Sequence, residues 1–186
     1  MLIINKIETL TKHQSVAITI SAAFAGSLLL ALLARLSIPV PISPVPITGQ
    51  TFGILFLGFV LGSRIGTLSV IMYISEGLIG LPVFAGGSFG FLYLLGPTGG
   101  YLIGFIIAVY LVGYLSEHGW INNFISAFLT MTIGTSVIFI FGISWVTVTA
   151  GLGTALSIGL FPYIPGAIIK IVLATVTVYS INRFNK

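Results

Sequence analysis

Apolar residues are grouped along this chain into six segments, separated by proline, glycine or charged residues. A membrane-spanning helix needs about 20 predominantly apolar residues, because the hydrocarbon core of a bilayer is about 30 Å thick. The six segments cover approximately residues 16–36, 50–61, 65–79, 101–115, 120–143 and 165–181. The second and third are short for a full span. The pattern therefore predicts an all-α membrane protein with about six transmembrane helices.

Three stretches between these segments are irregular in composition. They read SIPVPISPVPITG after the first segment, GLPVFAGGSFGFLYLLGPTGG after the third, and WVTVTAGLGTALSIGL before Phe161. Proline removes a backbone donor, and irregular backbone near bilayer depth persists only where it is buried in protein or lines a cavity. With six spans, all three stretches open toward the same side. We therefore expect external loops that cap a ligand cavity, with ordinary connecting loops as the alternative.

Composition supports the membrane assignment and narrows the function. The chain is 57% hydrophobic and 5% charged, whereas soluble domains carry about 25% charged residues. No soluble domain or long linker interrupts the pattern, so we expect residues 1–186 to form one domain surrounded by membrane lipid. The seven lysines and arginines are spread along the chain and make no patch for nucleic acid. The absence of cysteine excludes thiol chemistry and thiolate metal ligands.

The placement of charge predicts an orientation. Basic residues flank both ends of the apolar region at Lys6, Lys12, Arg183 and Lys186. Because lysine and arginine accumulate on the cytoplasmic side, we expect both termini to be cytoplasmic. Arg64 falls on that side too, whereas Arg35 falls outside and departs from the rule. The N-terminal residues resemble a signal peptide, but the apolar run is long for one, so we interpret it as a retained transmembrane helix.

One cation lies inside an apolar segment. The stretch FPYIPGAIIK places Pro165 near the start of the sixth helix and Lys170 more than one turn further on. A lysine at this depth can extend its side chain to the membrane interface. An ionisable residue within the membrane otherwise indicates a functional site, and an ammonium group suits a ligand carboxylate or a polarised carbonyl oxygen. Position alone leaves both interpretations of Lys170 open.

Few other side chains offer chemistry. Glu76 can accept hydrogen bonds from a ligand or pair with Lys170 or Arg35, but an interfacial glutamate facing water is the simpler interpretation. The chain has no aspartate, and His13 and His118 lie outside the segments, so a Ser–His dyad or a His/Glu metal site is not available at membrane depth. No GxxxxGK[ST] motif is present, so ATP-driven transport needs a separate ATPase. We expect no enzymatic activity, no metal and no cofactor.

The first segment carries small residues at helical spacing. Ala22 and Gly26 are four residues apart, as are Ala23 and Ser27. Pairs of this kind let two membrane helices approach closely, although small residues are common in membrane helices generally.

Several strings together resemble the BioY family. They are PVPITGQTFGILFLGFVLGSRIGTLSVIMYISEGLIGLPVFAGG, GPTGGYLIGF and PYIPGAIIK, and they span most of the chain in the same order. Members of this family are biotin-binding S components of energy-coupling-factor (ECF) vitamin transporters. The resemblance implies a six-helix protein that binds biotin near the external face and works with a transmembrane coupling protein and two ABC ATPases. It also implies that small residues of the first helix, here Ala22, Ala23, Gly26 and Ser27, pack against the coupling protein.

One family motif is altered. The C-terminal pattern of the family is similar to P-x-x-P-G-D-x-x-K, in which the Asp and the Lys contact the ligand. Lys170 matches the lysine, but Ala167 stands at the position of the Asp. The ureido ring of biotin has two N–H donors, and a buried donor without an acceptor costs about 1–3 kcal/mol. Weaker biotin binding, a related ligand and an altered site all remain open, and we hypothesise that Glu76 supplies the missing acceptor.

Five further residues are candidates for the ligand site. Thr48 and Gln50 follow the proline-rich stretch and offer donors and acceptors; Tyr101 and Phe84 can pack on the apolar parts of biotin; Ser88 lies in the glycine-rich cap and can bind a carboxylate. The alternative for Tyr101 and Phe84 is an interfacial or helix-packing role. The leading prediction is the substrate-binding subunit of a biotin uptake system in the cell membrane. The alternatives are an S component for another vitamin or precursor, a stand-alone facilitator, and a structural membrane protein.

Overall fold

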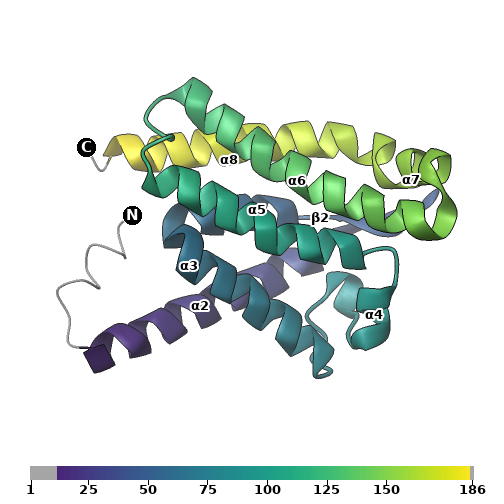
Figure 1. Ribbon diagram of the computed structural model, residues 1–186, viewed down its shortest axis with the longest axis horizontal. Helices are drawn as coiled ribbons and strands as arrows, with labels where there is room; N and C mark the ends of the chain where they lie inside the picture. The colour runs from purple at the N-terminus through teal and green to yellow at the C-terminus, as the bar shows by residue number, and fades with distance from the viewer. Residues whose placement is uncertain (1–11, 185–186) are drawn as a thin grey trace.

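The computed structural model describes residues 12–184, which form mainly long apolar helices (Figure 1). The long helices are α2 (Lys12–Arg35), α3 (Gln50–Leu78), α5 (Gly99–Glu117), α6 (Phe124–Ala150) and α8 (Ile164–Phe184). Short elements connect them: η1 (Ala85–Gly87), α4 (Phe91–Leu95), α7 (Leu152–Gly159) and η2 (Phe161–Tyr163). Among the described residues, five helical stretches are long and apolar enough to cross a membrane. The chain is therefore a multi-pass, mainly helical membrane protein.

Helix α3 reverses its direction at Gly62. This glycine has φ 75° and ψ −177°, a conformation that residues with a side chain rarely adopt. Gln50 Nε2 lies 2.7 Å from the Tyr73 hydroxyl, whereas a straight helix would separate these residues by about 35 Å. The two arms, residues 50–61 and 63–78, correspond to the second and third apolar segments of the sequence. The structure thus has five or six long helices, depending on whether α3 is counted once or twice.

The reversal of α3 is held by a carboxylate from α5. Glu117 accepts hydrogen bonds from the Ser63 backbone N–H (2.7 Å) and from the Ser63 hydroxyl (2.8 Å). Ser63 begins the second arm, where a backbone N–H has no partner within its own helix, and a negative charge is favourable at such a helix start. Gly113 allows the contact, because a Cβ atom there would lie 2.4 Å from the Ser63 nitrogen.

The centre of the molecule is formed by α3 and α5. Within the most apolar stretch of each helix, 67% of the α3 residues and 56% of the α5 residues are buried, against 22% in α2. Gly58 and Gly66 of α3 both pack against Val109 of α5, where an added Cβ would lie within 3.0 Å of Val109 atoms. Close approach through small residues is typical of membrane helices. The peripheral helices instead expose large apolar side chains, such as Leu32 of α2 and Leu173 of α8.

The proline-rich stretch forms an antiparallel hairpin of β1 (Ser37–Val40) and β2 (Ser43–Thr48), which an all-α prediction did not include. The pairs are Ser37 with Thr48, Ile38 with Ile47, and Val40 with Ser43. The register shifts between Ile38 and Val40, at the position of Pro39, which has no N–H to donate. Extended geometry was expected from the prolines, but strand pairing was not. Because β2 leads into α3, the hairpin brings its last residues to the centre of the molecule.

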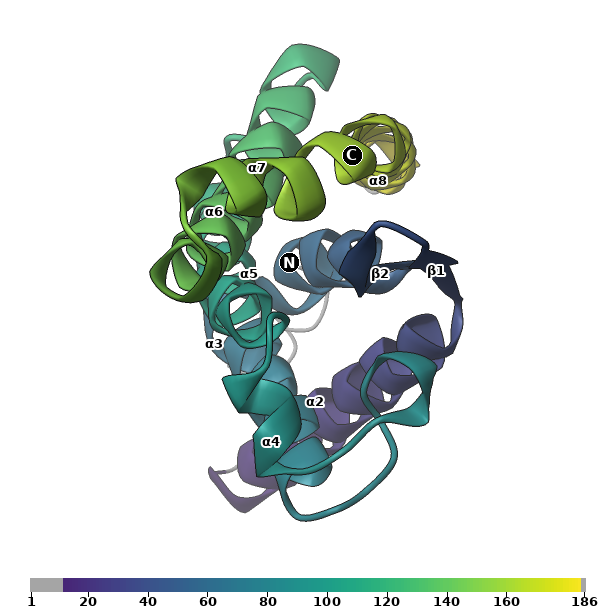
Figure 2. The same cartoon turned by 90° about the vertical axis from the view of Figure 1, so that its right-hand side faces the viewer.

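The short elements gather at one end of the long helices. Figure 1 shows β2, α4 and α7 toward one end, with the first turn of α2 and the last turn of α8 toward the other; Figure 2 looks onto the first of these ends. The predicted topology has the same arrangement, with the three irregular stretches on one side and both ends of the apolar region on the other. Lys6 and Lys186, two of the residues behind the predicted orientation, lie outside the described residues.

Candidate ligand-binding site

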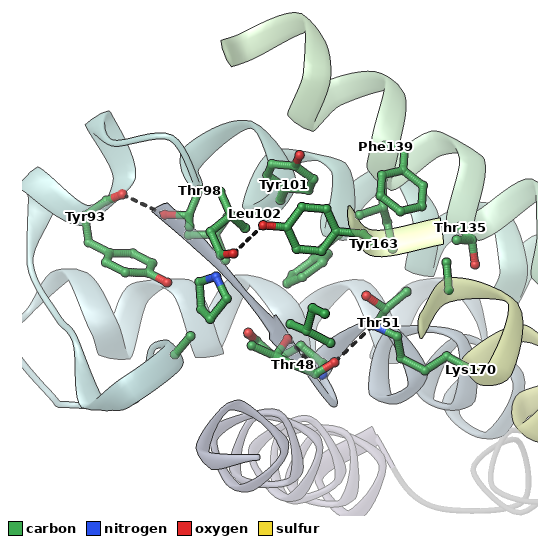
Figure 3. Close-up of a pocket in the computed structure, with 18 residues that line it drawn as sticks. Thr48, Thr51, Tyr93, Thr98, Tyr101, Leu102, Thr135, Phe139, Tyr163 and Lys170 are labelled. Atoms are coloured by element: carbon green, nitrogen blue, oxygen red, sulfur yellow. Dashed lines mark hydrogen bonds between the residues drawn. The ribbon is translucent and has the colours of Figure 1, made fainter. Parts of the chain in front are cut away.

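A pocket lies where the hairpin, the short elements and four long helices meet (Figure 3). All three irregular stretches contribute to it or adjoin it. Its walls are formed by Val45, Pro46, Ile47, Thr48, Gln50, Thr51, Ala85, Tyr93, Thr98, Tyr101, Leu102, Phe105, Thr135, Ile138, Phe139, Tyr163, Ala167 and Lys170. The cavity between them measures about 60 Å³, which is small beside the roughly 300–1,000 Å³ of typical ligand sites. This cavity by itself is therefore too small for a ligand of vitamin size, but the depression lined by Ser88 adjoins it and shares Pro46, Ala85 and Tyr93 with it.

Lys170 reaches the pocket from α8. Its Nζ atom donates a hydrogen bond to the backbone carbonyl of Thr48 at 3.1 Å, as Figure 3 shows. The side chain is half-buried, and among residues 12–184 no carboxylate forms an ion pair with it. An ammonium group has three N–H donors, so two remain for a ligand. The inward hydrogen bond favours the functional interpretation of this lysine over one in which it extends to the membrane interface.

Thr48 and Gln50 line the pocket beside Lys170. Gln50 is 4% exposed, and its Nε2 donates to the Tyr73 hydroxyl at 2.7 Å. The Tyr73 hydroxyl in turn donates to the Val83 carbonyl at 3.1 Å. The Thr48 side chain accepts from the Gln50 backbone N–H at 3.3 Å. The structure thus brings together three polar residues that the sequence indicated separately.

Two tyrosines hold the walls in place. The Tyr101 hydroxyl donates to the Gly159 carbonyl at 2.7 Å, and its ring packs so closely on Gly142 that an added Cβ would lie 2.3 Å from it. The Tyr163 hydroxyl donates to the Val45 carbonyl and so fastens η2 to the hairpin. Tyr101 was predicted to line the site. Tyr163 was missed, although it lies in the same PYIPG motif that drew attention to Lys170.

Sequence reasoning also missed Thr98 just before α5, Leu102 and Phe105 of α5, and Thr135, Ile138 and Phe139 of α6. These residues, together with the predicted Tyr101, follow helical spacing. Residues three or four apart share a face of a helix, but this signal is weak where every face is apolar. Tyr93 of α4 was missed too; burial raises the pKa of its hydroxyl, which is therefore neutral at physiological pH.

Three predicted site residues do not line the pocket. Phe84 is fully buried beside it, stacked on Tyr93 with ring centres 4.8 Å apart and edge-on to Tyr73 at 5.6 Å. Ser88 lines a shallower depression between the hairpin and the segment of residues 79–90 that follows α3. The Glu76 carboxylate accepts a hydrogen bond from the Ser27 hydroxyl at 2.8 Å, where α2 meets α3. We expected Glu76 to supply an acceptor inside the site, but it does not line the pocket.

The small residues of α2 mostly pack inside the chain. Ala23 and Ser27 are fully buried, and an added Cβ at Gly26 would lie 2.4 Å from the Ser69 hydroxyl of α3. Ala22 is partly exposed. Small residues that are exposed lie on another face of α2, at Ala17, Ser21 and Ala25. The face predicted to contact a partner is thus largely covered by α3.

The fold and the pocket define a class, a multi-pass membrane protein with a small-molecule pocket among its helices. The groups that line the pocket are hydroxyls, one amide, one ammonium and apolar surface, and residues 12–184 hold no cluster of three metal-ligating side chains. Residues 7–186 match the BioY family, and the chain belongs to this family, whose members are transporter components rather than enzymes. The resemblance indicated by the sequence motifs is confirmed.

Individual relatives agree with this assignment. The chain is 39% identical over 160 residues to the biotin transporter BioY of Rhizobium etli, covering 80% of this chain and 86% of that protein. It is 34% identical over 147 residues to the biotin transporter BioY of Thermotoga maritima, covering 78% and 86%. A crystal structure of the S-component for biotin from an ECF-type ABC transporter has a TM-score of 0.81 and 30% identity, covering 94% of this chain and 95% of that one.

Proposed function

We propose that this chain is a biotin-binding S component, which captures biotin from outside the cell and delivers it inward with an ECF coupling protein and two ABC ATPases. The observation that carries the proposal is the position of Lys170, inside the pocket of a BioY-family fold, with a backbone carbonyl as its protein partner. The similar proteins named as biotin transporters support the choice of ligand. The sequence has no P-loop, so any ATP hydrolysis that drives transport has to take place on separate subunits.

Biotin in this pocket would be bound by both apolar and polar contacts. Its bicyclic ring would lie against apolar side chains of α5 and α6, and Lys170 would donate to the ureido carbonyl. The valeryl chain would extend toward the depression that contains Ser88, because Pro46, Ala85 and Tyr93 belong to the walls of both spaces. Apolar burial supplies affinity in sites of this kind, and a few polar groups set the orientation.

Entry of biotin requires the cap to move. The segment after α3, residues 79–90, covers the pocket and contains Gly80, Gly86, Gly87 and Gly90 with positive φ. Its closed position is fixed by Arg35, whose Nη2 donates to the Pro82 carbonyl at 2.6 Å. Arg35 departs from the charge rule for orientation, and this contact gives it a structural role at that end of the molecule. Opening of this segment would enlarge the cavity.

We propose an orientation with both termini in the cytoplasm and residues 1–186 acting as one domain. Arg183 on the last turn of α8 and Arg64 after the reversal of α3 support this orientation, because lysine and arginine accumulate on the cytoplasmic side. Arg35 and Lys170 lie at the pocket end instead. The coupling protein would contact α2 along Ala17, Ser21 and Ala25, which are exposed and one turn apart. We propose this face as the contact surface instead of Ala22, Ala23, Gly26 and Ser27, which were expected from the sequence but mostly pack against α3.

Calorimetry on the purified, detergent-solubilised protein tests the ligand. Biotin should bind with a dissociation constant in the nanomolar to micromolar range, and thiamine and riboflavin should not compete. Tight binding of another vitamin or precursor without biotin binding would assign the chain to a different S component. Purification from cells that express the chain with ECF subunits tests the assembly. Recovery of the chain without a coupling protein or ATPases would indicate a stand-alone facilitator.

A further inference from the structure

The Gln50 side chain lies at one end of a buried relay of hydrogen bonds. Its Nε2 donates to the Tyr73 hydroxyl, which donates to the backbone carbonyl of Val83 in the cap segment. Gln50 is 4% exposed and Tyr73 is 0% exposed, so water does not compete for these contacts. The relay joins the first arm of α3, the second arm and the cap.

The relay fixes which way the Gln50 amide faces. A tyrosine hydroxyl has one hydrogen to donate, and Val83 receives it; among the described residues no other group donates to the Val83 carbonyl. The Tyr73 oxygen must then accept, and only the NH₂ end of the Gln50 amide can donate to it. The flipped amide would leave the Val83 carbonyl without a donor, at the cost of an unpaired buried acceptor. The carbonyl oxygen of the amide, Oε1, therefore points away from Tyr73.

Oε1 is free to accept a hydrogen bond from a ligand. Gln50 lines the pocket, and within residues 12–184 no protein group donates to this atom. Lys170 Nζ, which reaches the pocket from α8, bonds the carbonyl of Thr48, two residues before Gln50. The pocket thus offers a donor and an acceptor close together. A cyclic urea has the complementary pair, a carbonyl acceptor beside N–H donors.

We propose that Tyr73 is a positioning residue that holds the Gln50 amide with Oε1 toward the pocket, where it accepts a ureido N–H of the ligand. Gln50 thereby supplies the acceptor that Ala167 cannot supply, whereas Glu76 does not line the pocket and accepts from Ser27 instead. This inference rests on the proposed function, since it specifies how the same pocket recognises biotin. Because Val83 belongs to the cap, closure of the cap and orientation of the acceptor are coupled.

Tyr73 also packs against Phe84, so loss of its hydroxyl must be separated from loss of packing. Biotin dissociation constants should be measured by calorimetry for the unmutated protein, Tyr73→Phe, Gln50→Ala and the double variant. We expect Tyr73→Phe to weaken binding by about tenfold, the size of one hydrogen bond. The double variant should bind no more weakly than Gln50→Ala, because Tyr73 acts through Gln50. Tyr110→Phe, which removes the hydroxyl of an exposed tyrosine on α5, is the matched control and should change nothing.

Independent, additive effects of the two substitutions on the binding free energy would overturn the inference while leaving biotin binding intact. Failure of the unmutated protein to bind biotin would overturn the proposed function and this inference with it. The two failures are therefore distinguishable.

A second measurement leaves Tyr73 in place, in case Tyr73→Phe does not fold. The probe is 2-iminobiotin, in which the ureido group is replaced by a guanidinium-like cation. Gln50→Glu should shift the ratio of biotin to 2-iminobiotin dissociation constants by at least about tenfold toward the cation, because a carboxylate pairs strongly with charged N–H groups. An unchanged ratio would show that position 50 does not face the ligand N–H groups, and would sink the proposal.

Discussion

The two polar walls of the pocket are built in opposite ways. Gln50 lies on α3, the most buried helix, and its amide is held by a relay that ends in the cap. Lys170 lies on α8, a peripheral helix with many exposed apolar side chains, and its ammonium group has one protein hydrogen bond. One wall therefore presents an acceptor of fixed direction, while the other presents a flexible donor that can exchange a backbone carbonyl for a ligand. Pre-organisation on one side reduces the entropy cost of binding, and on the other side Lys170 can leave the Thr48 carbonyl to bind the ligand.

The largest effect should come from the flexible wall. We expect Lys170→Ala to weaken biotin binding by about 100-fold, because a hydrogen bond to a charged group contributes about 1.5–3 kcal/mol. Calorimetry on the detergent-solubilised variant measures this loss. Arg183→Ala, at the far end of the same helix, is the control and should bind normally. A Lys170→Ala protein that binds within about threefold of the unmutated one would remove this lysine from the ligand site.

The fixed wall should be most sensitive at Gly77. A Cβ atom there would lie 2.1 Å from the Phe84 ring, so Gly77→Ala should displace Phe84 and disturb Tyr73, on which that ring packs. We expect a loss of about 1–3 kcal/mol in stability, as for other overpacked cores, together with weaker biotin binding. Thermal unfolding in detergent measures the first effect. Gly153→Ala, where a Cβ meets no neighbour within 4 Å, is the matched control. Equal melting temperatures for the two variants would contradict the close packing around Phe84.

The reversal of α3 offers a smaller test of the same wall. Glu117→Gln keeps the shape of the side chain but removes the charge that accepts from Ser63. We expect it to lower the free energy of unfolding by about 1 kcal/mol, because charge-assisted bonds at a helix start are stronger than neutral ones. Biotin affinity should be unchanged, since the reversal at Gly62 lies away from the pocket. Unaltered thermal stability would show that the turn at Gly62 holds without the carboxylate.

The smallest effect should come from restoring the family motif. Ala167 lines the pocket three residues before Lys170. If Gln50 Oε1 already accepts the ligand N–H, Ala167→Asp should change biotin affinity by less than about threefold. A gain of about 100-fold would instead show that the acceptor is missing in this chain. The comparison of the two walls would then have to be revised, with α8 supplying both polar contacts.

Residues that line the pocket could be predicted from the sequence where their type is unusual for its surroundings, and not where it is typical of a membrane helix. Lys170 was found because a cation inside an apolar helix is expensive, and Thr48 and Gln50 because they follow a run of prolines. Phe139 and Thr135 were missed because they look like ordinary residues of a span. Glu76 was misplaced because its partner Ser27 lies on a different helix, and a distance between helices cannot be read from spacing along the chain.

The fold was predictable to a similar degree. The six apolar segments were visible from hydropathy, and Arg64 lies between the second and third. The pairing of β1 with β2 was not visible, because four prolines between Ser37 and Thr48 argue for extended backbone without indicating a partner. The bond between Ser63 and Glu117 joins positions 54 residues apart, and nothing local to either residue predicts it.

The glycines between the central helices limit which mutations the protein can tolerate. At Gly58 and Gly113, a Cβ atom would lie 2.9 Å and 2.4 Å from backbone atoms of the neighbouring helix. Every codon change that replaces glycine adds at least that atom, so these positions have no neutral alternatives. Leu32 is 67% exposed on the surface of α2 and can exchange with other apolar residues. After random mutagenesis and selection for transport, surviving substitutions should accumulate on the outer helices and be absent from these glycines. The positions without substitutions would then identify the contact between α3 and α5.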